Sequence, residues 1–194
     1  MYRNLHKAAY LQQFDYKNIN KYRTVNYCPN CGKDLAPRED DFQKCNNCGY
    51  VNYVNPQTAT AILITDGNKY LLGKRKSENV KNGFWALPGG FIEFKEDFIT
   101  AAKREVKEET NLDIEIDRII NVSHNFLNRN LHSLVIVLHA RVINGEAEAG
   151  DDISEVKWFK YGEDMPEMAF DADIHIINYY YQKKPEGIKI EETL

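Results

Sequence analysis

The chain has 194 residues, of which 43% are hydrophobic, and a formal net charge of −4. This length fits a domain of about 150 residues with a small attachment. The negative charge argues against a protein that binds nucleic acid over a broad surface. The sequence has no apolar run approaching the roughly 18 residues that a membrane span needs, and residues 1–20 lack the core of a signal peptide. We therefore expect a cytoplasmic protein that does not insert into a membrane.

The first part of the chain matches no pattern that we can assign. Tyr10, Leu11 and Phe14 have the spacing of a short helix that would pack on the following segment or on a second subunit. All four cysteines follow in one short stretch. Three parts are expected: an N-terminal segment at 1–24, a cysteine-containing segment at 25–54 and the main domain at 55–194.

The cysteines form two pairs, Cys28-Pro-Asn-Cys31 and Cys45-Asn-Asn-Cys48, with thirteen residues between them. Four thiolates suit tetrahedral Zn²⁺, and the glycine after each pair permits the tight turn of a zinc ribbon. Disulfides are the alternative, which a reducing cytosol disfavours. The ribbon is expected to be structural, although it could also form a dimer interface or a wall of a substrate site. It has too few basic residues to follow a phosphate backbone.

After the cysteines, apolar and β-branched runs alternate with turn residues. The sequence predicts a linker at 52–56, strands at 58–65, 69–75, 112–122, 132–142 and 155–160, turns at 66–68 and 144–145, a loop at 77–85, and a final helix capped by Asp171 and ending at Tyr181. The strand at 132–142 is the most apolar and is expected to be central. His132 and His139 lie in it and are interpreted as sheet residues.

A helix is also predicted within the stretch GFIEFKEDFITAAKREVKEETNL, which spans residues 90–112. Phe98, Ala102 and Val106 recur at four-residue spacing and would form its buried stripe. The loop 87–90, Leu-Pro-Gly-Gly, precedes the helix, and its paired glycines allow the backbone to approach a ligand or a metal closely.

The opposite face of this helix carries Glu105, Glu108 and Glu109, which are three and four residues apart. Carboxylates at this spacing repel each other by a few tenths of a kcal/mol per pair. A hard divalent cation with oxygen ligands, such as Mg²⁺, would explain such a surface. The alternative is a solvated helix that happens to be acidic.

The spacing closely resembles the Nudix box, Gly-x5-Glu-x7-Arg-Glu-U-x-Glu-Glu-x-Gly-U, in which U is apolar. The residues that match are, in order, Gly90, Glu96, Arg104, Glu105, Val106, Glu108, Glu109 and Leu112. Asn111 replaces the last glycine of the motif. That position is expected to be the left-handed residue after the helix, where Asn is tolerated next best after Gly.

The resemblance implies an α/β protein with the Nudix α/β/α sandwich and a mixed sheet, from about residue 55 to the end, preceded by the zinc ribbon. It implies bound Mg²⁺ (or Mn²⁺) with ligands from Gly89, through its carbonyl, and from Glu105, Glu108 and Glu109. Arg104 would orient the glutamates through a bidentate salt bridge. Glu96 would contact the metal-binding residues without binding the metal itself, or it would cap the N-terminus of the helix.

The resemblance leaves the general base open between a box glutamate and an acid on a distant loop. Glu105 is the first candidate, because it lies one turn before the other two glutamates. The alternatives are Glu108, Asp151, Asp152 and Glu155.

A zinc ribbon before a Nudix domain resembles the NADH pyrophosphatases, which favours NADH, ADP-ribose or a similar substrate. The Ser-Gln-Pro-Trp signature of those enzymes is absent from the corresponding stretch, 123–130. The marks of other Nudix subtypes are absent as well, so the subtype stays open. The candidate substrate contacts are Arg75, Trp85, Phe170 and Arg129; Arg75 would otherwise be a surface residue, and the two aromatic side chains would otherwise belong to the core.

Two hypotheses of function follow. The first is a Mg²⁺-dependent hydrolase that cleaves a nucleoside diphosphate linked to another moiety into a nucleoside monophosphate and a phosphorylated remainder. The second is a non-catalytic sensor that binds a nucleotide and whose ribbon contacts a protein or nucleic-acid partner. The intact set of glutamates favours the hydrolase. A homodimer is compatible with either hypothesis.

Overall fold

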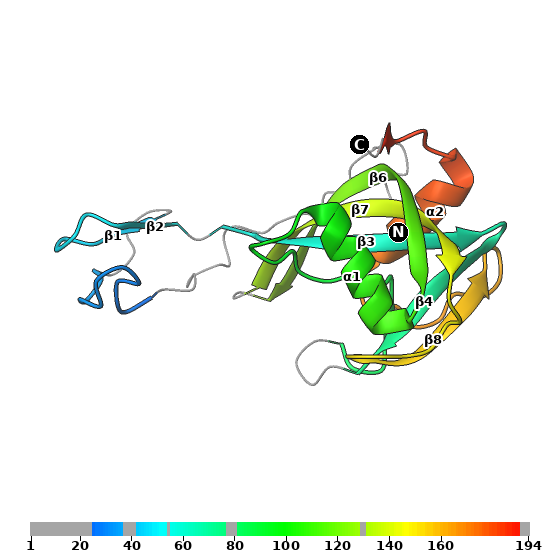
Figure 1. The fold of residues 1–194 in the computed structure, drawn as a ribbon, viewed down its shortest axis with the longest axis horizontal. Coiled ribbons are helices and arrows are strands. Elements are labelled where there is room, and N and C mark those ends of the chain that lie inside the picture. The colour runs from blue at the N-terminus through cyan, green and yellow to red at the C-terminus, as the bar shows by residue number, and fades with distance from the viewer. Residues whose placement is uncertain (1–24, 37–41, 54, 77–80, 129–130, 191–194) are drawn as a thin grey trace.

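The computed structural model describes residues 25–36, 42–53, 55–76, 81–128 and 131–190, without the side chains of 126–131. The main domain contains β3 (Gln57–Asp66), β4 (Lys69–Arg75), β5 (Trp85–Ala86), α1 (Phe98–Thr110), β6 (Asp113–Asn128), β7 (Leu131–Asn144), β8 (Ile153–Lys160), α2 (Asp171–Lys183) and β9 (Ile188–Lys189). The strand order is β5-β4-β3-β7-β6-β9, with β8 paired to β4. β3 and β7 are parallel, whereas β6 and β7 are antiparallel, so the sheet is mixed as expected (Figure 1).

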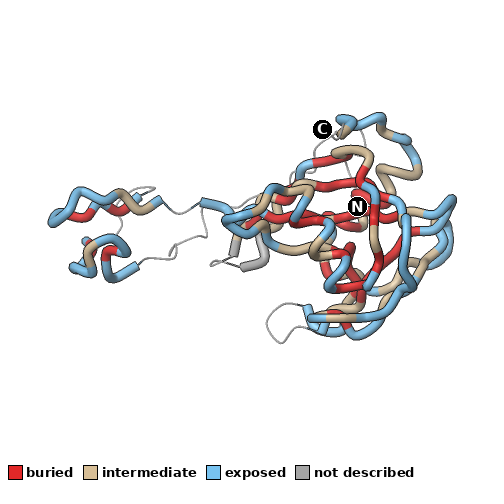
Figure 2. Tube along the Cα trace, in the orientation of Figure 1, coloured by how far each residue is buried: buried red, intermediate tan, exposed pale blue. Residues whose placement is uncertain are grey.

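Two apolar clusters cover the two faces of this sheet. Side chains of successive residues in β3 alternate between them: Ile62 joins the cluster that contains residues of α1, and Leu63 joins the cluster that contains residues of α2. Figure 2 shows the buried chain concentrated along the central strands. Each helix therefore covers one face, and the predicted α/β/α sandwich is confirmed.

Helix α1 begins and ends as its sequence dictates. The Asp97 side chain accepts hydrogen bonds from the N–H groups of residues 99 and 100, at 2.9 and 2.8 Å. Ala102 and Val106 are completely buried, and Phe98 packs against the same cluster. Asn111 ends the helix with φ of 58° and ψ of 11°, which confirms the left-handed position expected for it.

Several predicted boundaries were wrong. The helix cap is Asp97 and not Glu96, because the Glu96 carboxylate is bound to Arg104 instead. In α2 the N-cap is Phe170, and Asp171 is the first helical residue. The strand predicted at 112–122 runs on to residue 128, because its antiparallel pairing with β7 continues that far.

The predicted linker and loop were also too long. Residues 52 and 53 belong to a strand of the cysteine segment, and residue 85 belongs to β5. The short helix predicted around Tyr10, Leu11 and Phe14 lies outside the described residues.

The cysteine segment is a small lobe beyond the start of β3 (Figure 1). It contains β1 (Phe42–Lys44) and β2 (Val51–Tyr53), which pair antiparallel. Cys28, Leu35 and Cys45 are its buried apolar residues among those described and form a separate cluster with Cys31. Neither α1 nor α2, the helices within the described part of the chain, is long and apolar enough to cross a membrane.

Candidate active site

The loop at 87–90 runs beside β3 like a further strand. The N–H groups of Thr60 and Ile62 donate hydrogen bonds to carbonyl groups of this loop, over 2.9 and 2.8 Å. Gly89 has φ of +144°, and a Cβ at this position would overlap the carbonyl oxygen of Thr60. A side chain is therefore excluded there, which explains the glycine and the close approach of the loop to the sheet.

Glu109 of α1 is bound to this loop. Its Oε2 accepts a hydrogen bond from the Gly89 N–H, at 2.9 Å, and the residue is only 3% exposed. Burial raises the pKa of the Glu109 carboxyl well above its usual value, against the effect of that hydrogen bond. A buried carboxylate with a single hydrogen bond needs a nearby positive charge to remain ionised.

Arg104 holds the acidic residues around it in fixed positions. Its Nε and Nη2 donate to the two carboxylate oxygens of Glu96, at 3.0 and 2.6 Å. Its Nη1 donates to Glu105 at 2.9 Å and to Glu108 at 3.0 Å, and Nη2 also reaches the Phe91 carbonyl at 3.2 Å. The bidentate pair that the motif suggested thus forms with Glu96, while Arg104 makes single hydrogen bonds to two glutamates of the helix.

A cavity of about 370 Å³ lies between the loop, α1 and the start of α2. The carboxylates among its lining residues are Glu93, Glu105, Glu109, Asp151, Asp152 and Asp173, and the cations are Arg75 and Arg104. Acidic groups therefore outnumber basic ones in a partly enclosed space. Such an excess is unfavourable without a bound cation.

Glu105, Glu109 and Asp152 are three of these six carboxylates. Burial raises the pKa of Glu105, which the Arg104 guanidinium only partly offsets, and Asp152 raises it further. Asp152 also raises the pKa of Glu109. Carboxylate oxygens are the donors that Mg²⁺ or Mn²⁺ prefers. The donor chemistry of these cavity residues therefore suits a divalent cation.

The same cavity carries two of the predicted substrate contacts. The guanidinium of Arg75 lies 5.7 Å from the centre of the Phe170 ring, in a cation–π arrangement, and 3.6 Å from Asp152. Both Arg75 and Phe170 line the cavity. The structure therefore brings a positive charge and an aromatic ring to the same pocket as the carboxylates.

Other predicted residues lie elsewhere. Trp85 is 9% exposed and packs edge-on against Phe159, with 4.9 Å between ring centres, so it is a core residue and does not line the cavity. The Glu155 side chain is half-exposed and pairs with Lys74 at 3.7 Å. Arg129 lies outside the described residues. Trp85 is therefore withdrawn as a substrate contact.

Glu108 differs from the other two helix glutamates. Its side chain is 49% exposed and it does not line the cavity, although it shares Arg104 with Glu105. The helical spacing predicted one shared face for all three glutamates, but α1 turns Glu109 inward and Glu108 outward. Glu108 stays a prediction as a metal ligand.

Sequence reasoning missed Asp173, which is buried in the cavity wall. A signal was present, because Asp173 lies four residues before the apolar Ile177 and so falls on the same face of the helix. A carboxylate on the buried face of a helix requires a partner.

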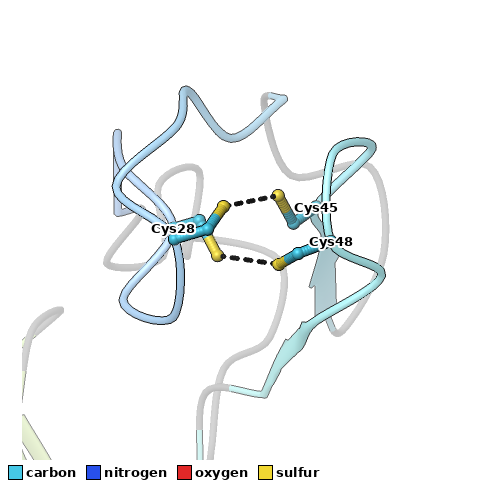
Figure 3. Close-up of side chains that lie close together, drawn as sticks. Cys28, Cys45 and Cys48 are labelled. Carbon is cyan, nitrogen blue, oxygen red and sulfur yellow. Dashed lines mark hydrogen bonds between the residues drawn. The ribbon is translucent and has the colours of Figure 1, made fainter.

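The four cysteines come together in the small lobe, as Figure 3 shows for three labelled residues. The Sγ atoms of Cys28 and Cys48 are 3.7 Å apart, as are those of Cys31 and Cys45, and all four lie within 4.8 Å of one another. A tetrahedron with Zn–S bonds of about 2.3 Å has edges of about 3.8 Å, whereas a disulfide has a bond of about 2.05 Å. The geometry fits zinc and excludes disulfides.

Two amide side chains support the thiolate form of these cysteines. Asn30 donates to Sγ of Cys48 at 3.5 Å and Asn47 donates to Sγ of Cys31 at 3.6 Å. The hydrogen bond from Asn30 is the main cause that lowers the pKa of Cys48 to about 6. Burial raises the pKa of Cys28 to about 11, so a cation is needed to hold all four thiolates together.

A family model described as NUDIX domain matches residues 55–180. The chain belongs to the Nudix hydrolase family. The matched residues include the loop at 87–90 and helix α1, which form the Nudix box and line the cavity described above. Among solved structures, a NUDIX hydrolase from Nitrosomonas europaea has the same fold, with a TM-score of 0.71, 24% identity, and coverage of 86% of this chain and 97% of that one.

Named relatives fall into two groups. An ADP-ribose pyrophosphatase of Methanocaldococcus jannaschii is 39% identical over 131 residues, which are 67% of this chain and 76% of that protein. The NAD-capped RNA hydrolases NudC of Pseudomonas aeruginosa and Haemophilus influenzae are 26% and 29% identical, over 81% and 77% of this chain. The matches span only 56% and 57% of the length of those NudC proteins.

Proposed function

We propose that this Nudix hydrolase uses Mg²⁺ (or Mn²⁺) to cleave the pyrophosphate of a nucleoside diphosphate linked to another moiety, giving a nucleoside monophosphate and a phosphorylated remainder. One observation carries the proposal: a single cavity is lined by the carboxylates of Glu105 and Glu109, of which Glu109 is buried, and by Arg75 and Phe170. A nucleotide diphosphate offers a partner to each of these groups, with phosphates for a bound cation and for Arg75 and a base for the aromatic ring.

The residues have distinct roles in this proposal. Glu105, Glu109 and the Gly89 carbonyl would hold the cation, with Glu108 as an outer member of the set. When bound, the cation would neutralise the diphosphate oxygens and help to ionise the attacking water. Glu105 is the proposed base, because its carboxylate lines the cavity one helical turn before Glu109.

Arg104 would keep Glu105 in this position through the hydrogen bond between its Nη1 and the carboxylate. Asp152 is the alternative base. It lines the same cavity, but its carboxylate pairs with the Arg75 guanidinium at 3.6 Å. Glu155 is not favoured, because its exposed side chain lies outside the cavity lining.

ADP-ribose and the dinucleotide NADH or its oxidised form are the proposed substrates. The ADP-ribose pyrophosphatase and the NudC hydrolases named above are relatives whose substrates all contain an ADP-ribosyl group, and the cavity offers Phe170 for a ring and Arg75 for a phosphate. The non-catalytic sensor is not favoured, because a binding module has no need for the complete glutamate set.

The decisive experiment is monophosphate release from ADP-ribose, NADH, NAD⁺, diadenosine polyphosphates, nucleotide sugars and nucleoside triphosphates, with Mg²⁺, with Mn²⁺ and with neither. Metal-dependent release of AMP from ADP-ribose or NADH supports the proposal. Failure of a folded, zinc-loaded protein to cleave any of these substrates would shift the assignment to the sensor.

The division of the chain is part of the same proposal. Residues 25–54 would form a structural zinc ribbon and residues 55–194 the hydrolase domain, with a homodimer as an open prediction. The thiolate cluster supports the first boundary, and the match of the family model from residue 55 supports the second.

A further inference from the structure

Asp173 is a buried carboxylate that the proposed reaction does not use. It lies in the first turn of α2, is 3% exposed and lines the cavity. Its Oδ2 accepts a hydrogen bond from the Leu87 N–H at 3.0 Å, across 86 positions in the sequence. Burial raises the pKa of Asp173 to about 7, although the nearby Arg75 opposes this change.

Leu87 opens the loop that carries the two glycines. Just before it, the Trp85 N–H donates to the Glu167 carbonyl at 2.9 Å, and the Ala169 N–H donates to the Trp85 carbonyl at 2.7 Å. With the Asp173 hydrogen bond, these contacts tie the segment that leads into α2 to the chain that leads into the loop.

The loop therefore has three independent anchors. Its carbonyls accept from β3, its Gly89 N–H donates to Glu109 of α1, and its first N–H donates to Asp173 of α2. Two of these anchors are buried carboxylates on opposite helices, and each binds one N–H of the same short loop. The third is the backbone of a strand, which no side-chain substitution removes.

We propose that Asp173 is a positioning residue: by accepting from the Leu87 N–H, it sets the loop so that the Gly89 carbonyl faces the carboxylates, and it couples that loop to Phe170 at the start of α2. This inference rests on the proposed function. Phe170 is three residues before Asp173 and is the N-cap of α2, so a substrate that moves the start of α2 also moves the loop.

The test compares Asp173→Asn with Asp173→Ala. Asn keeps an oxygen that accepts from the Leu87 N–H, whereas Ala removes it. Asp171→Asn, at an exposed position of the same helical turn, is the matched control. The readouts are kcat, KM, the Mg²⁺ concentration for half-maximal rate, and hydrogen exchange of the Leu87 amide measured by NMR without metal or substrate.

We expect Asp173→Ala to lower kcat and to raise the half-maximal Mg²⁺ concentration, each at least 10-fold, the size of effect typical of supporting residues around a metal site. The Leu87 amide should exchange at least 10-fold faster. Asp173→Asn should restore all three values to within about threefold of wild type, as conservation of the hydrogen bond predicts.

Two outcomes would overturn the inference. One is a folded Asp173→Ala protein with wild-type exchange at Leu87 and wild-type dependence on Mg²⁺. The other is an Asp173→Asn protein that keeps the Leu87 amide protected but loses as much activity as Asp173→Ala, which would assign Asp173 a direct role in binding or proton transfer. Amide exchange needs no turnover. If the wild-type protein is inactive on every substrate, the proposed function fails, but the effect of Asp173 on exchange of the Leu87 amide can still be measured.

Discussion

The Gly89 N–H donates a hydrogen bond to Oε2 of Glu109 over 2.9 Å, and this contact joins the two halves of the Nudix box. This hydrogen bond occupies one lone pair of the buried Glu109 carboxylate, and the same side chain lines the cavity. The same peptide approaches β3 so closely that a side chain on Gly89 has no room. The position of Glu109 and the absence of a side chain at Gly89 are thus parts of one constraint.

Glu105→Gln should lower kcat by roughly 10²–10⁴-fold, the range for loss of a general base. The amide keeps the size of the side chain and can still accept from Arg104, so the protein should fold normally. Monophosphate release under saturating Mg²⁺ measures the effect, and Glu148→Gln, at an exposed position, is the control. Wild-type kcat in Glu105→Gln, with Asp152→Asn inactive, would move the base to Asp152.

Gly89→Ala should lower the free energy of unfolding by about 2–4 kcal/mol, through backbone strain and overlap with Thr60. It should also abolish most of the activity, because the loop must move away from β3. Gly67→Ala is the matched control: its φ is +58° and a Cβ there meets nothing within 4 Å. That variant should lose only about 1–2 kcal/mol and keep its kcat.

Urea unfolding of both glycine variants gives the free energies for this comparison. Equal losses at the two positions would mean that strain alone matters and that the contact with β3 does not. A stable Gly89→Ala protein with full activity would contradict the loop geometry itself.

Much of the site was predictable because its signals are local. The period of α1, the left-handed Asn111 and the pairs of cysteines each depend on residues within a few positions of one another. Local spacing did not predict which of the helix glutamates are buried and which are exposed. Glu108 and Glu109 are adjacent, and small differences in how α1 lies against the sheet decide which of them is buried.

Other features depend on contacts between distant segments. The Asp173 hydrogen bond spans 86 positions and requires the mixed order of strands to bring α2 beside the loop. The true length of β6 is likewise set by its register with β7 and not by its own composition. Trp85 illustrates the same limit, because its packing on Phe159 of β8 decides that it is a core residue.

Cys45→Ser should abolish zinc binding, because Cys45 is one of the four cysteines expected to hold zinc and is 1% exposed. Metal analysis should find no zinc in this variant, against one zinc ion per chain in the wild type. Trypsin should then cut the segment 25–53, whose buried cluster contains little besides cysteines. Lys33→Ser, at an exposed position in the same lobe, should keep its zinc and its resistance to trypsin.

The unfolding transition of the Nudix domain should be unchanged in Cys45→Ser, because its two apolar clusters contain no residue of the cysteine segment. A large fall in the melting temperature of the whole protein would show instead that the two parts stabilise each other.

The network around His139 predicts a loss of stability in acid. Its Nδ1 lies 2.7 Å from Asp117, and its Nε2 lies 2.9 Å from the Thr65 hydroxyl and 2.8 Å from the Tyr180 hydroxyl. Burial lowers the pKa of His139, and this outweighs the opposite effect of Asp117. The neutral ring is therefore the form that the folded protein favours.

An unfolded histidine takes up a proton near its ordinary pKa of about 6.5, so below this pH the unfolded chain binds more protons than the folded one. The stabilisation is fully present above about pH 6.5 and declines as the pH falls, by at most about 1.4 kcal/mol per pH unit for one group. Burial raises the pKa of Asp173 and of Glu109, and these groups contribute a slope of the opposite sign. The contribution of His139 is therefore measured as the difference between the slopes of wild type and His139→Gln in urea unfolding between pH 8 and pH 5.5. Burial also lowers the pKa of His132 and His175, so part of the slope should persist. Identical slopes in His139→Gln and wild type would mean that His139 has the same pKa in the folded and unfolded protein.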